Sequence, residues 1–346
     1  MKIDRVAGRA DLTAFVNLPF RLYRGDPNWI PPIKADVRKL LDVGTHPFYD
    51  GGREAVRELF LARDGDRVVG RVAAILNHAH NRVHEENVGF FGFFESVNDP
   101  KVAAALFAAA EDWLAGKGVT AVRGPANPST NYECGLLTDG FDRPPVLMMT
   151  YNPPWYLDLV EGAGYGKAKD LYAYFSPVHD ASLTRLKKLG ARAERRNPGL
   201  KTRKVDLENF DREVELIKGL YNAAWEKNWG FVPVSSAEFD ALAGELKSLV
   251  HPELVRIAFI DDEPVGFILT VPDWNPVLAD LGGSLWRHPI KLLRHLLFTK
   301  AESLEGIRLV LLGMKEGFRN RGIESLLFAN GIEVALEAGY RWCEYS

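Results

Sequence analysis

The stretch LVLLGMKEGFRNRGIESLL, residues 309–327, combines three kinds of pattern in direct succession. Its apolar beginning, which extends back to Arg308 and ends at Met314, predicts a buried strand. A polar turn that contains a glycine follows at 315–318. From Ile323 onward, apolar residues recur at helical spacing on one side. The stretch therefore predicts a strand, a turn and a helix with nothing between them.

The junction between the predicted strand and helix has the composition of an anion site. A glycine at the mouth of a helix lets the backbone approach a ligand closely. The first N–H groups of the helix lack intrahelical partners and carry the positive end of the helix dipole. Two arginines beside them add positive charge. The free N–H groups, the helix dipole and the arginines together favour binding of a pyrophosphate. The junction residues are Arg319, Asn320, Arg321, Gly322 and Ile323.

This spacing resembles the acyl-CoA cradle of the GNAT acyltransferase superfamily, in which a strand is followed by Arg/Gln-x-x-Gly-x-Gly/Ala. Arg319 and Gly322 match the first two marked places. Glu324 departs from the third, where the family has a small residue, and a carboxylate beside a pyrophosphate is repulsive unless it points away. For the motif alone, the alternative is an ordinary strand–turn–helix with exposed arginines.

The resemblance implies that acetyl-CoA or a longer acyl-CoA is the co-substrate and that no metal is needed. It implies that the backbone at the end of the strand pairs with the pantetheine arm and polarises the thioester carbonyl. The strand residues are Leu312, Gly313 and Met314. The phosphate contacts would come, mainly through backbone, from Arg319, Asn320, Arg321, Gly322, Ile323 and Glu324.

Length and composition narrow the class of protein. The 346 residues suggest two domains. The net charge of −3 argues against a general nucleic-acid binder. Cys134 and Cys343 are the only cysteines in the sequence, which fits a reducing compartment. No secretory signal pattern and no apolar run of about 20 residues is visible, so we expect a cytoplasmic protein and leave peripheral membrane contact open.

A repeat runs through the chain. Both halves show the order helix, helix, hairpin, strand, helix, strand, which is the order of the GNAT fold, and such self-similarity indicates duplication. The first-half features Leu22-Tyr23, Asn28-Trp29, Pro31 and Val69-Gly70 are echoed by Leu220-Tyr221, Asn228-Trp229, Pro233 and Val265-Gly266.

We therefore predict an α/β (α+β) fold with two GNAT-like domains, each a mixed, mostly antiparallel sheet flanked by helices. Residues 1–176 form the first, without a cradle, because 94–103 supply no Arg-x-x-Gly. Residues 177–205 form a basic linker or helix, and 206–346 form the second domain with the cradle. The chain ends shortly after Gly339, so we expect a truncated second domain with an open edge at 340–345.

Acyl transfer to an amine requires a group that takes the amine proton. Glu344, on the last predicted strand, and Asp273, after the second hairpin, are the candidates. The alternative for each is a surface or salt-bridged carboxylate. The resemblance places the acceptor pocket at an aromatic group whose alternative role is core packing. These residues are Tyr221, Trp225, Asn228 and Trp229.

Two further groups of residues give only weak indications of a functional site. His78, His80 and His84 lie close in sequence without a carboxylate pattern, so we predict ordinary polar residues and no metal site. Cys134 has no histidine at a spacing that indicates a nucleophile.

The sequence is thus predicted to encode an acyl-CoA-dependent N-acyltransferase with a small-molecule or lipid-like primary amine as acceptor. The chain resembles a bacterial tandem GNAT group whose members include ceramide synthases, which N-acylate long-chain amines. The basic amphipathic segment 289–298 also favours a lipid-like substrate. One alternative is an aminoacyl transferase of the Fem type, although the net charge counts against tRNA binding. Another is a degenerate pair that binds without catalysis, which Glu324 favours. The oligomeric state is not indicated.

Overall fold

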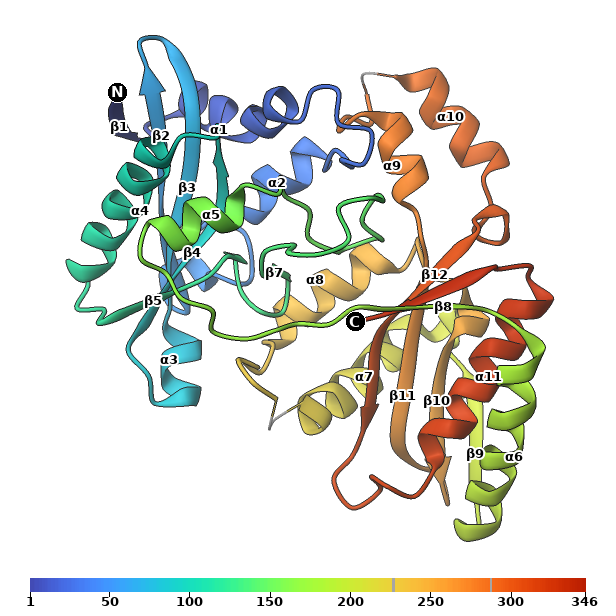
Figure 1. Cartoon of the computed structure of the whole chain (residues 1–346). Helices are drawn as coiled ribbons and strands as arrows, with labels where there is room; N and C mark the ends of the chain where they lie inside the picture. Colours follow the sequence, from blue (N-terminus) through green and yellow to red (C-terminus); the bar gives the residue numbers. More distant parts are fainter. Residues whose placement is uncertain (226–227, 287) are drawn as a thin grey trace. The chain divides into compact units, whose positions relative to one another are not determined.

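The computed structural model describes residues 1–225, 228–286 and 288–346. It divides into two compact units (Figure 1). The first comprises Met1–Asp170 and Val277–Leu292, and the second comprises Leu171–Pro276 and Leu293–Ser346. None of the described helices is long and apolar enough to cross a membrane.

The first unit is built on a five-stranded sheet in the order β1-β2-β3-β4-β5. Its strands pair antiparallel, apart from the parallel pair β4–β5. The predicted hairpin turn joins β2 to β3, with Gly65 at a φ of 56°. The strands are β1 (Lys2–Arg5), β2 (Ala55–Asp64), β3 (Arg67–Asn77), β4 (Val88–Ser96) and β5 (Ala121–Arg123).

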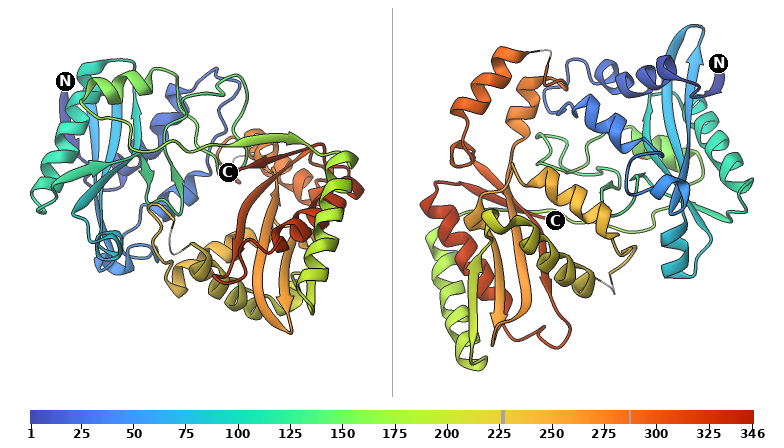
Figure 2. Two further views of the ribbon diagram at one scale, coloured as in Figure 1. Left: turned by 60° about the horizontal axis from the view of Figure 1, so that its bottom comes forward. Right: turned by 180° about the vertical axis from the view of Figure 1, so that it is seen from behind.

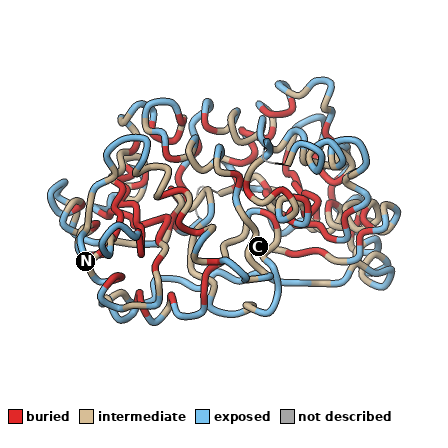
Figure 3. Tube along the Cα trace, turned by 90° about the horizontal axis from the view of Figure 1, so that it is seen from above, coloured by how far each residue is buried: buried red, intermediate tan, exposed pale blue. Residues whose placement is uncertain are grey.

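Helices cover both faces of this sheet, so alternate residues of β2 and β3 enter two separate cores. One core contains Phe60 and Val72 with Leu106 of α4, and the other contains Leu59 and Ala73 with Phe15 of α1. Figure 3 colours the buried residues of the chain red. The helices are α1 (Arg9–Leu22), α2 (Lys34–Leu40), α3 (His78–His84), α4 (Pro100–Ala115) and α5 (Tyr156–Gly162), and the two short strands are β6 (Ala126–Asn127) and β7 (Glu133–Cys134).

A charged group lies inside the first unit. Arg71 and Glu95 are paired at 3.5 Å between Nη2 and Oε1, and both side chains are largely buried. The Tyr156 hydroxyl donates to Glu95 Oε2 at 2.7 Å, and Arg71 Nη1 donates to the Phe15 carbonyl at 2.7 Å. Burial raises the pKa of Glu95, and the guanidinium of Arg71 opposes this rise. Each charge therefore depends on the other for compensation.

The second unit has a six-stranded sheet in the order β8-β13-β12-β11-β10-β9. Only β12 and β13 pair in parallel, which confirms the predicted mixed, mostly antiparallel sheet. The strands are β8 (Tyr174–Pro177), β9 (Leu200–Lys204), β10 (Val255–Ile260), β11 (Glu263–Pro272), β12 (Gly306–Met314) and β13 (Trp342–Tyr345).

Helices α6 and α11 lie side by side on one face of the second sheet, and α7 packs against β11 and β12 from the other (Figure 2). Helix α8 packs on α7. The helices from residue 180 onward are α6 (Asp180–Arg196), α7 (Phe210–Trp225), α8 (Ser236–Leu246), α9 (Asn275–Leu281), α10 (Pro289–Phe298) and α11 (Ile323–Glu337). The 3₁₀ turns of the described chain are η1 (Asp50–Gly52), η2 (Leu207–Asn209), η3 (Pro252–Leu254) and η4 (Ala301–Ser303).

The expectation of an open edge at 340–345 is wrong. Strand β8 pairs antiparallel with β13, with Trp342 opposite Pro177 and Tyr345 opposite Tyr174. Residues 174–176, which were expected to end the first domain, thus belong to an edge strand of the second sheet. Its β-prone residues Tyr174 and Phe175 reveal a strand, but not which sheet the strand joins.

The range 177–205, expected as a basic linker or helix, contains α6 and β9. Both lie in the second unit, where α6 packs on α11 and β9 pairs with β10. The exposed basic side chains of this range lie on a helix and an edge strand, which is typical of a solvated amphipathic pattern.

Candidate functional site

Strand β12 has one edge that is only half paired. It pairs with β13 from Gly306 to Leu309, while its other edge pairs with β11 as far as Met314. Along 310–314, no strand of the described residues lies on the β13 side. Accordingly, Val310 to Leu312 are half-buried although they lie in the middle of the sheet. Their outward backbone groups can pair with an extended ligand.

A bulge lies where this free edge begins. Leu311 is opposite Leu269 and Leu309 is opposite Thr270, so Val310 has no partner on β11. A bulge re-aims the backbone groups of the extra residue. The free edge therefore starts at a residue whose N–H and C=O are not fixed by regular pairing.

The corresponding place in the first unit is closed by the chain itself. Strand β4 pairs with β5 only from Val88 to Phe90 and then continues alone to Ser96. Its bulge residue Phe93 donates its N–H to Asn127 Oδ1 at 2.6 Å. A Cβ on Gly92 would lie 1.8 Å from the Ala126 carbonyl oxygen. The segment around β6 thus occupies the edge that β12 leaves open.

The helices that follow these two strands also begin differently. Helix α4 starts after Asp99, whose side chain accepts the Lys101 N–H at 2.9 Å. Helix α11 starts after Gly322 in the left-handed region, φ 83°, and no described side chain caps it. Orphan N–H groups and the helix dipole at such a start favour an anion.

Arg319 holds the turn before α11 in place. Its Nη2 donates to the Ala224 carbonyl at 2.7 Å and its Nε donates to the Met314 carbonyl at 3.3 Å. These bonds tie the turn to the end of α7 and to the end of β12. From the other side, Asn197 Nδ2 donates to the Arg321 carbonyl at 3.4 Å.

Arg321 and Glu324 supply opposite charges at the start of α11. Arg321 is exposed, with its guanidinium carbon 4.9 Å from the centre of the Phe318 ring. Glu324 lies in the first turn of α11, and its buried Oε2 accepts no hydrogen bond from the described residues. The carboxylate therefore competes with any anion that binds at this helix start.

Glu344 lies beside the point where the free edge begins. It is buried on β13 directly opposite Arg308, with 3.7 Å between Arg308 Nε and Glu344 Oε2. Neither carboxylate oxygen accepts a hydrogen bond within the described chain. Arg308 instead donates to Ser346 Oγ at 3.0 and 2.8 Å. A buried carboxylate without donors is costly, and a bound amine would supply them.

Asp273, the other predicted base, lies on the far side of β12 from β13. Its backbone N–H donates to the Gly306 carbonyl at 2.8 Å, and its buried Oδ1 accepts the Asn275 N–H at 3.3 Å. This carboxylate therefore contacts the start of α9, as a helix-capping residue does.

The predicted acceptor residues fall into two groups. Tyr221 and Trp225 stack at 5.0 Å, and a Cβ on Gly313 would lie 2.3 Å from the Trp225 ring. Burial, with a smaller contribution from Glu238, raises the pKa of Tyr221. These two rings pack α7 onto the sheet beneath β12. Asn228 donates its N–H to the Trp225 carbonyl at 2.8 Å, and Trp229 is exposed at the surface.

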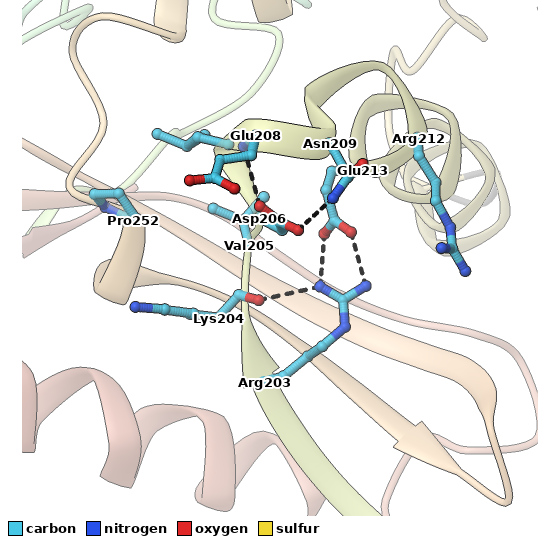
Figure 4. A pocket seen from close by; sticks show the side chains of 10 residues that line it. Arg203, Lys204, Val205, Asp206, Glu208, Asn209, Arg212, Glu213 and Pro252 are labelled. Atoms are coloured by element: carbon cyan, nitrogen blue, oxygen red, sulfur yellow. Dashed lines mark hydrogen bonds and ion pairs between the residues drawn. The ribbon is translucent and has the colours of Figure 1, made fainter.

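A cavity of about 630 Å³ lies elsewhere in the second unit, at β9, η2 and the start of α7 (Figure 4). Strand β9 is separated from β12 by β10 and β11. Arg203 forms a two-pronged pair with Glu213 at 2.7 and 2.8 Å. Hydrogen bonds from Asn209 and the Glu208 N–H lower the pKa of Asp206. Three basic and three acidic side chains line the cavity, so it presents no dominant charge to a ligand.

The predicted histidine group lies at α3. His80 is buried, with Nε2 3.1 Å from Glu86 Oε2 and its ring 4.4 Å from that of His84. Across the part of the chain that the structure describes, no three His, Cys, Asp or Glu side chains gather as metal ligands.

Comparison with known proteins places these features in a family. No family model matches the chain. Protein YghO of Escherichia coli (strain K12) is 34% identical over 310 residues, which cover 89% of this chain and 77% of that protein. Bacterial ceramide synthase of Caulobacter vibrioides (strain NA1000 / CB15N) is 36% identical over 344 residues, which cover 97% of this chain and 87% of that protein.

Solved structures agree on the fold. A tandem GNAT protein from the clavulanic acid biosynthesis pathway superposes with a TM-score of 0.52 at 12% identity, over 99% of this chain and 89% of its own. A GCN5-related glucosamine N-acetyltransferase region of a fungal multi-domain enzyme gives 0.51 at 12% identity, over 99% and 35%.

The two sheets have the same order of elements, and they differ in that the chain fills the edge of β4 but leaves the edge of β12 free. Together they define a tandem GNAT-fold acyltransferase. The chain belongs to the bacterial tandem GNAT family that includes the Caulobacter ceramide synthase and YghO. The predicted fold and the resemblance to this family are thereby confirmed.

Several residues that shape the site were not predicted. Arg308 stands as one charge inside an apolar run, and that signal could have identified a buried ion pair. The bulge at Val310 and the turn contact of Asn197 have no sequence signal, because both depend on which strand or helix packs alongside.

Proposed function

We propose that the second unit binds acyl-CoA and transfers its acyl group to the primary amine of a long-chain acceptor. The observation that carries this proposal is the continuity of the free edge of β12 with the uncapped start of α11. A CoA molecule combines an extended chain of amides with a pyrophosphate. The first suits an unpaired strand edge, and the second suits a helix N-terminus.

The proposed contacts to CoA come from two consecutive segments of the chain, the end of β12 and the start of α11. Backbone groups of 310–314 pair with the pantetheine arm, and the first N–H groups of α11 receive the pyrophosphate. Arg321 adds charge from an exposed position, and Arg319 keeps the turn in shape through two backbone carbonyls. The first unit supports these contacts by analogy. At its equivalent bulge, the N–H of Phe93 already donates to an amide oxygen, that of Asn127.

The reaction needs a free amine and a polarised thioester. The amine nitrogen attacks the thioester carbonyl, the C–N bond forms, the C–S bond breaks, and the thiolate leaves and is protonated. We assign the Val310 N–H to the carbonyl oxygen, because Val310 has no residue opposite it on β11 and lies where the free edge begins. We assign Glu344 as the acceptor of the amine proton, because its oxygens lack donors and it lies next to that bulge.

The acceptor class rests on the relatives. Similarity to the Caulobacter protein named a bacterial ceramide synthase extends over nearly the whole chain. It supports a long-chain amino alcohol as acceptor and a long acyl chain on CoA. A non-catalytic role is the second candidate, because the Glu324 carboxylate occupies the helix start where the family has a small residue.

A turnover assay tests this function. Thiol release is measured with acetyl-CoA and palmitoyl-CoA against sphinganine, a short alkylamine and an amino acid, and the product is identified by mass spectrometry. We expect N-acylated sphinganine with palmitoyl-CoA as the preferred donor. Tight binding of acyl-CoA without turnover of any amine would support the non-catalytic role instead.

Arg319→Ala and Arg321→Ala are expected to distinguish an arginine that holds the shape of the turn from one that only adds positive charge to the CoA site. Arg319→Ala removes two hydrogen bonds to backbone carbonyls, so the affinity for CoA falls roughly tenfold and the melting temperature also falls. Arg321→Ala removes an exposed charge, so the affinity falls a few-fold at unchanged melting temperature. Calorimetry with CoA and thermal unfolding provide both readouts. Equal effects of the two variants on melting would contradict the roles assigned here.

Glu324→Gln is expected to increase CoA affinity about three- to tenfold. The change removes a negative charge from the first turn of α11 at constant side-chain size. The gain should shrink at high ionic strength, because salt screens the repulsion. Glu333→Gln, on the same helix but away from its start, is the matched control. A loss of affinity on Glu324→Gln would show that the carboxylate is a ligand contact.

A further inference from the structure

The segment around α10 exposes an unusual amount of apolar surface. Five of its side chains, Ile290, Leu293, Leu296, Leu297 and Phe298, are between 56% and 83% exposed. Trp286, just before the helix, is 84% exposed. Soluble proteins expose such clusters mainly at interaction sites.

These residues form one continuous face. Ile290, Leu293 and Leu297 recur at spacings of three and four residues, and Leu296 adjoins them. Leu292 and His295, which project to the other side of the helix, are half-buried. The apolar side of the helix is therefore the side that is most exposed. It is the orange helix labelled α10 in Figure 1.

The charge of the segment indicates which kind of partner its apolar face binds. The sequence contains no acidic residue between Asp280 and Glu302, whereas Arg294 and Lys300 are basic. The ammonium of Lys291 is already paired with Asp280 Oδ1 at 2.8 Å. The chain as a whole has a net charge of −3, so this positive charge is local. Basic residues beside an apolar helical face favour the surface of an anionic lipid bilayer. Aromatic side chains at the two ends, Trp286 and Phe298, are typical of the bilayer interface.

We propose that α10 is a peripheral membrane anchor that inserts its apolar face into the headgroup region of an anionic bilayer. The helix lies parallel to the membrane, with Ile290, Leu293 and Leu297 toward the acyl chains. Lys300 lies at the level of the lipid phosphates. This role does not depend on acyl transfer, since it concerns binding of the protein to a surface.

Flotation with lipid vesicles tests the anchor on the full chain. Wild-type protein is expected to float with vesicles of phosphatidylcholine mixed with phosphatidylglycerol. The variant Leu293→Glu/Leu297→Glu should bind at least roughly tenfold more weakly, because it places charges on the inserted face. Lys300→Glu should weaken binding to the anionic vesicles alone. Val83→Glu, at an exposed apolar position on α3, is the matched control and should bind as wild type does.

Three results would overturn the proposal. Wild-type protein that stays with the aqueous phase excludes a membrane anchor. A double variant that floats as wild type does excludes α10 as the contact. Sedimentation velocity decides the third, since self-association of the wild type that the double variant abolishes would assign the apolar face to a second copy of the chain. Vesicle binding is measured without substrates, so failure of the anchor and failure of the acyltransferase assignment are distinguishable.

Discussion

Glu344→Gln is expected to lower kcat by roughly 10²–10⁴-fold while the affinity for acyl-CoA stays within a few-fold of wild type. Gln keeps the size of the side chain but cannot take a proton from the amine. The buried carboxylate accepts no hydrogen bond from the described chain, so a bound amine is the natural donor to it. Steady-state thiol release gives kcat, and calorimetry with acyl-CoA gives the affinity.

A matched carboxylate completes this test. Asp273→Asn is the control, because this carboxylate accepts an N–H at the start of α9. It should change kcat by much less than Glu344→Gln. If Asp273→Asn abolished turnover and Glu344→Gln did not, Asp273 would be the base.

Arg71→Met is expected to destabilise the first unit by about 3–5 kcal/mol, because it leaves Glu95 buried without its positive partner. For a unit of this size, such a loss lowers the melting temperature by roughly 6–20 °C. Thermal and chemical unfolding measure the change. Arg53→Met, which removes an exposed ion pair with Asp50, is the control and should have little effect.

The sign of the pH effect follows from Glu95. Burial raises its folded-state pKa, and removal of Arg71 raises it further. A carboxyl group with a raised folded-state pKa contributes stability below its unfolded pKa and loses that contribution as the pH rises through the folded value. The deficit of Arg71→Met should therefore be small near pH 4.5 and large near pH 8. Adding Glu95→Gln should remove most of this dependence, and a deficit that grows toward acid would contradict it.

The order of elements could be predicted from sequence because helices, hairpins and apolar strands have local signals. The run from Leu309 to Leu327 shows a strand, a glycine and a helix within a few residues, and the structure has the same succession. The echo of Val69-Gly70 in Val265-Gly266 indicated the duplication for the same reason.

Pairing between distant segments could not be predicted in this way. Tyr174 and Phe175 have the pattern of a strand in either unit, and only the sheet shows that β8 lies beside β13. Likewise, a tyrosine and a tryptophan one turn apart fit a pocket or a core, and packing of Trp225 over Gly313 is a property of the folded sheet.

The closed and open edges explain why a duplicated fold would use one cofactor site. In the first unit, Asn127 satisfies the bulge N–H of Phe93, and Asp99 caps the following helix. In the second unit, the bulge at Val310 and the start of α11 after Gly322 have no such side-chain partners among the described residues. The backbone groups along this edge of β12 are therefore available to an extended ligand.

Hydrogen–deuterium exchange with and without CoA tests this central claim most directly. We predict that CoA slows exchange in peptides that cover 310–325 and leaves peptides that cover 91–103 unchanged. The same experiment on Arg321→Glu should show less protection at equal CoA concentration, and Lys101→Glu, at the equivalent helix start of the first unit, should behave as wild type does. Protection confined to 91–103, or protection in neither region at saturating CoA, would contradict a cofactor site on β12 and α11.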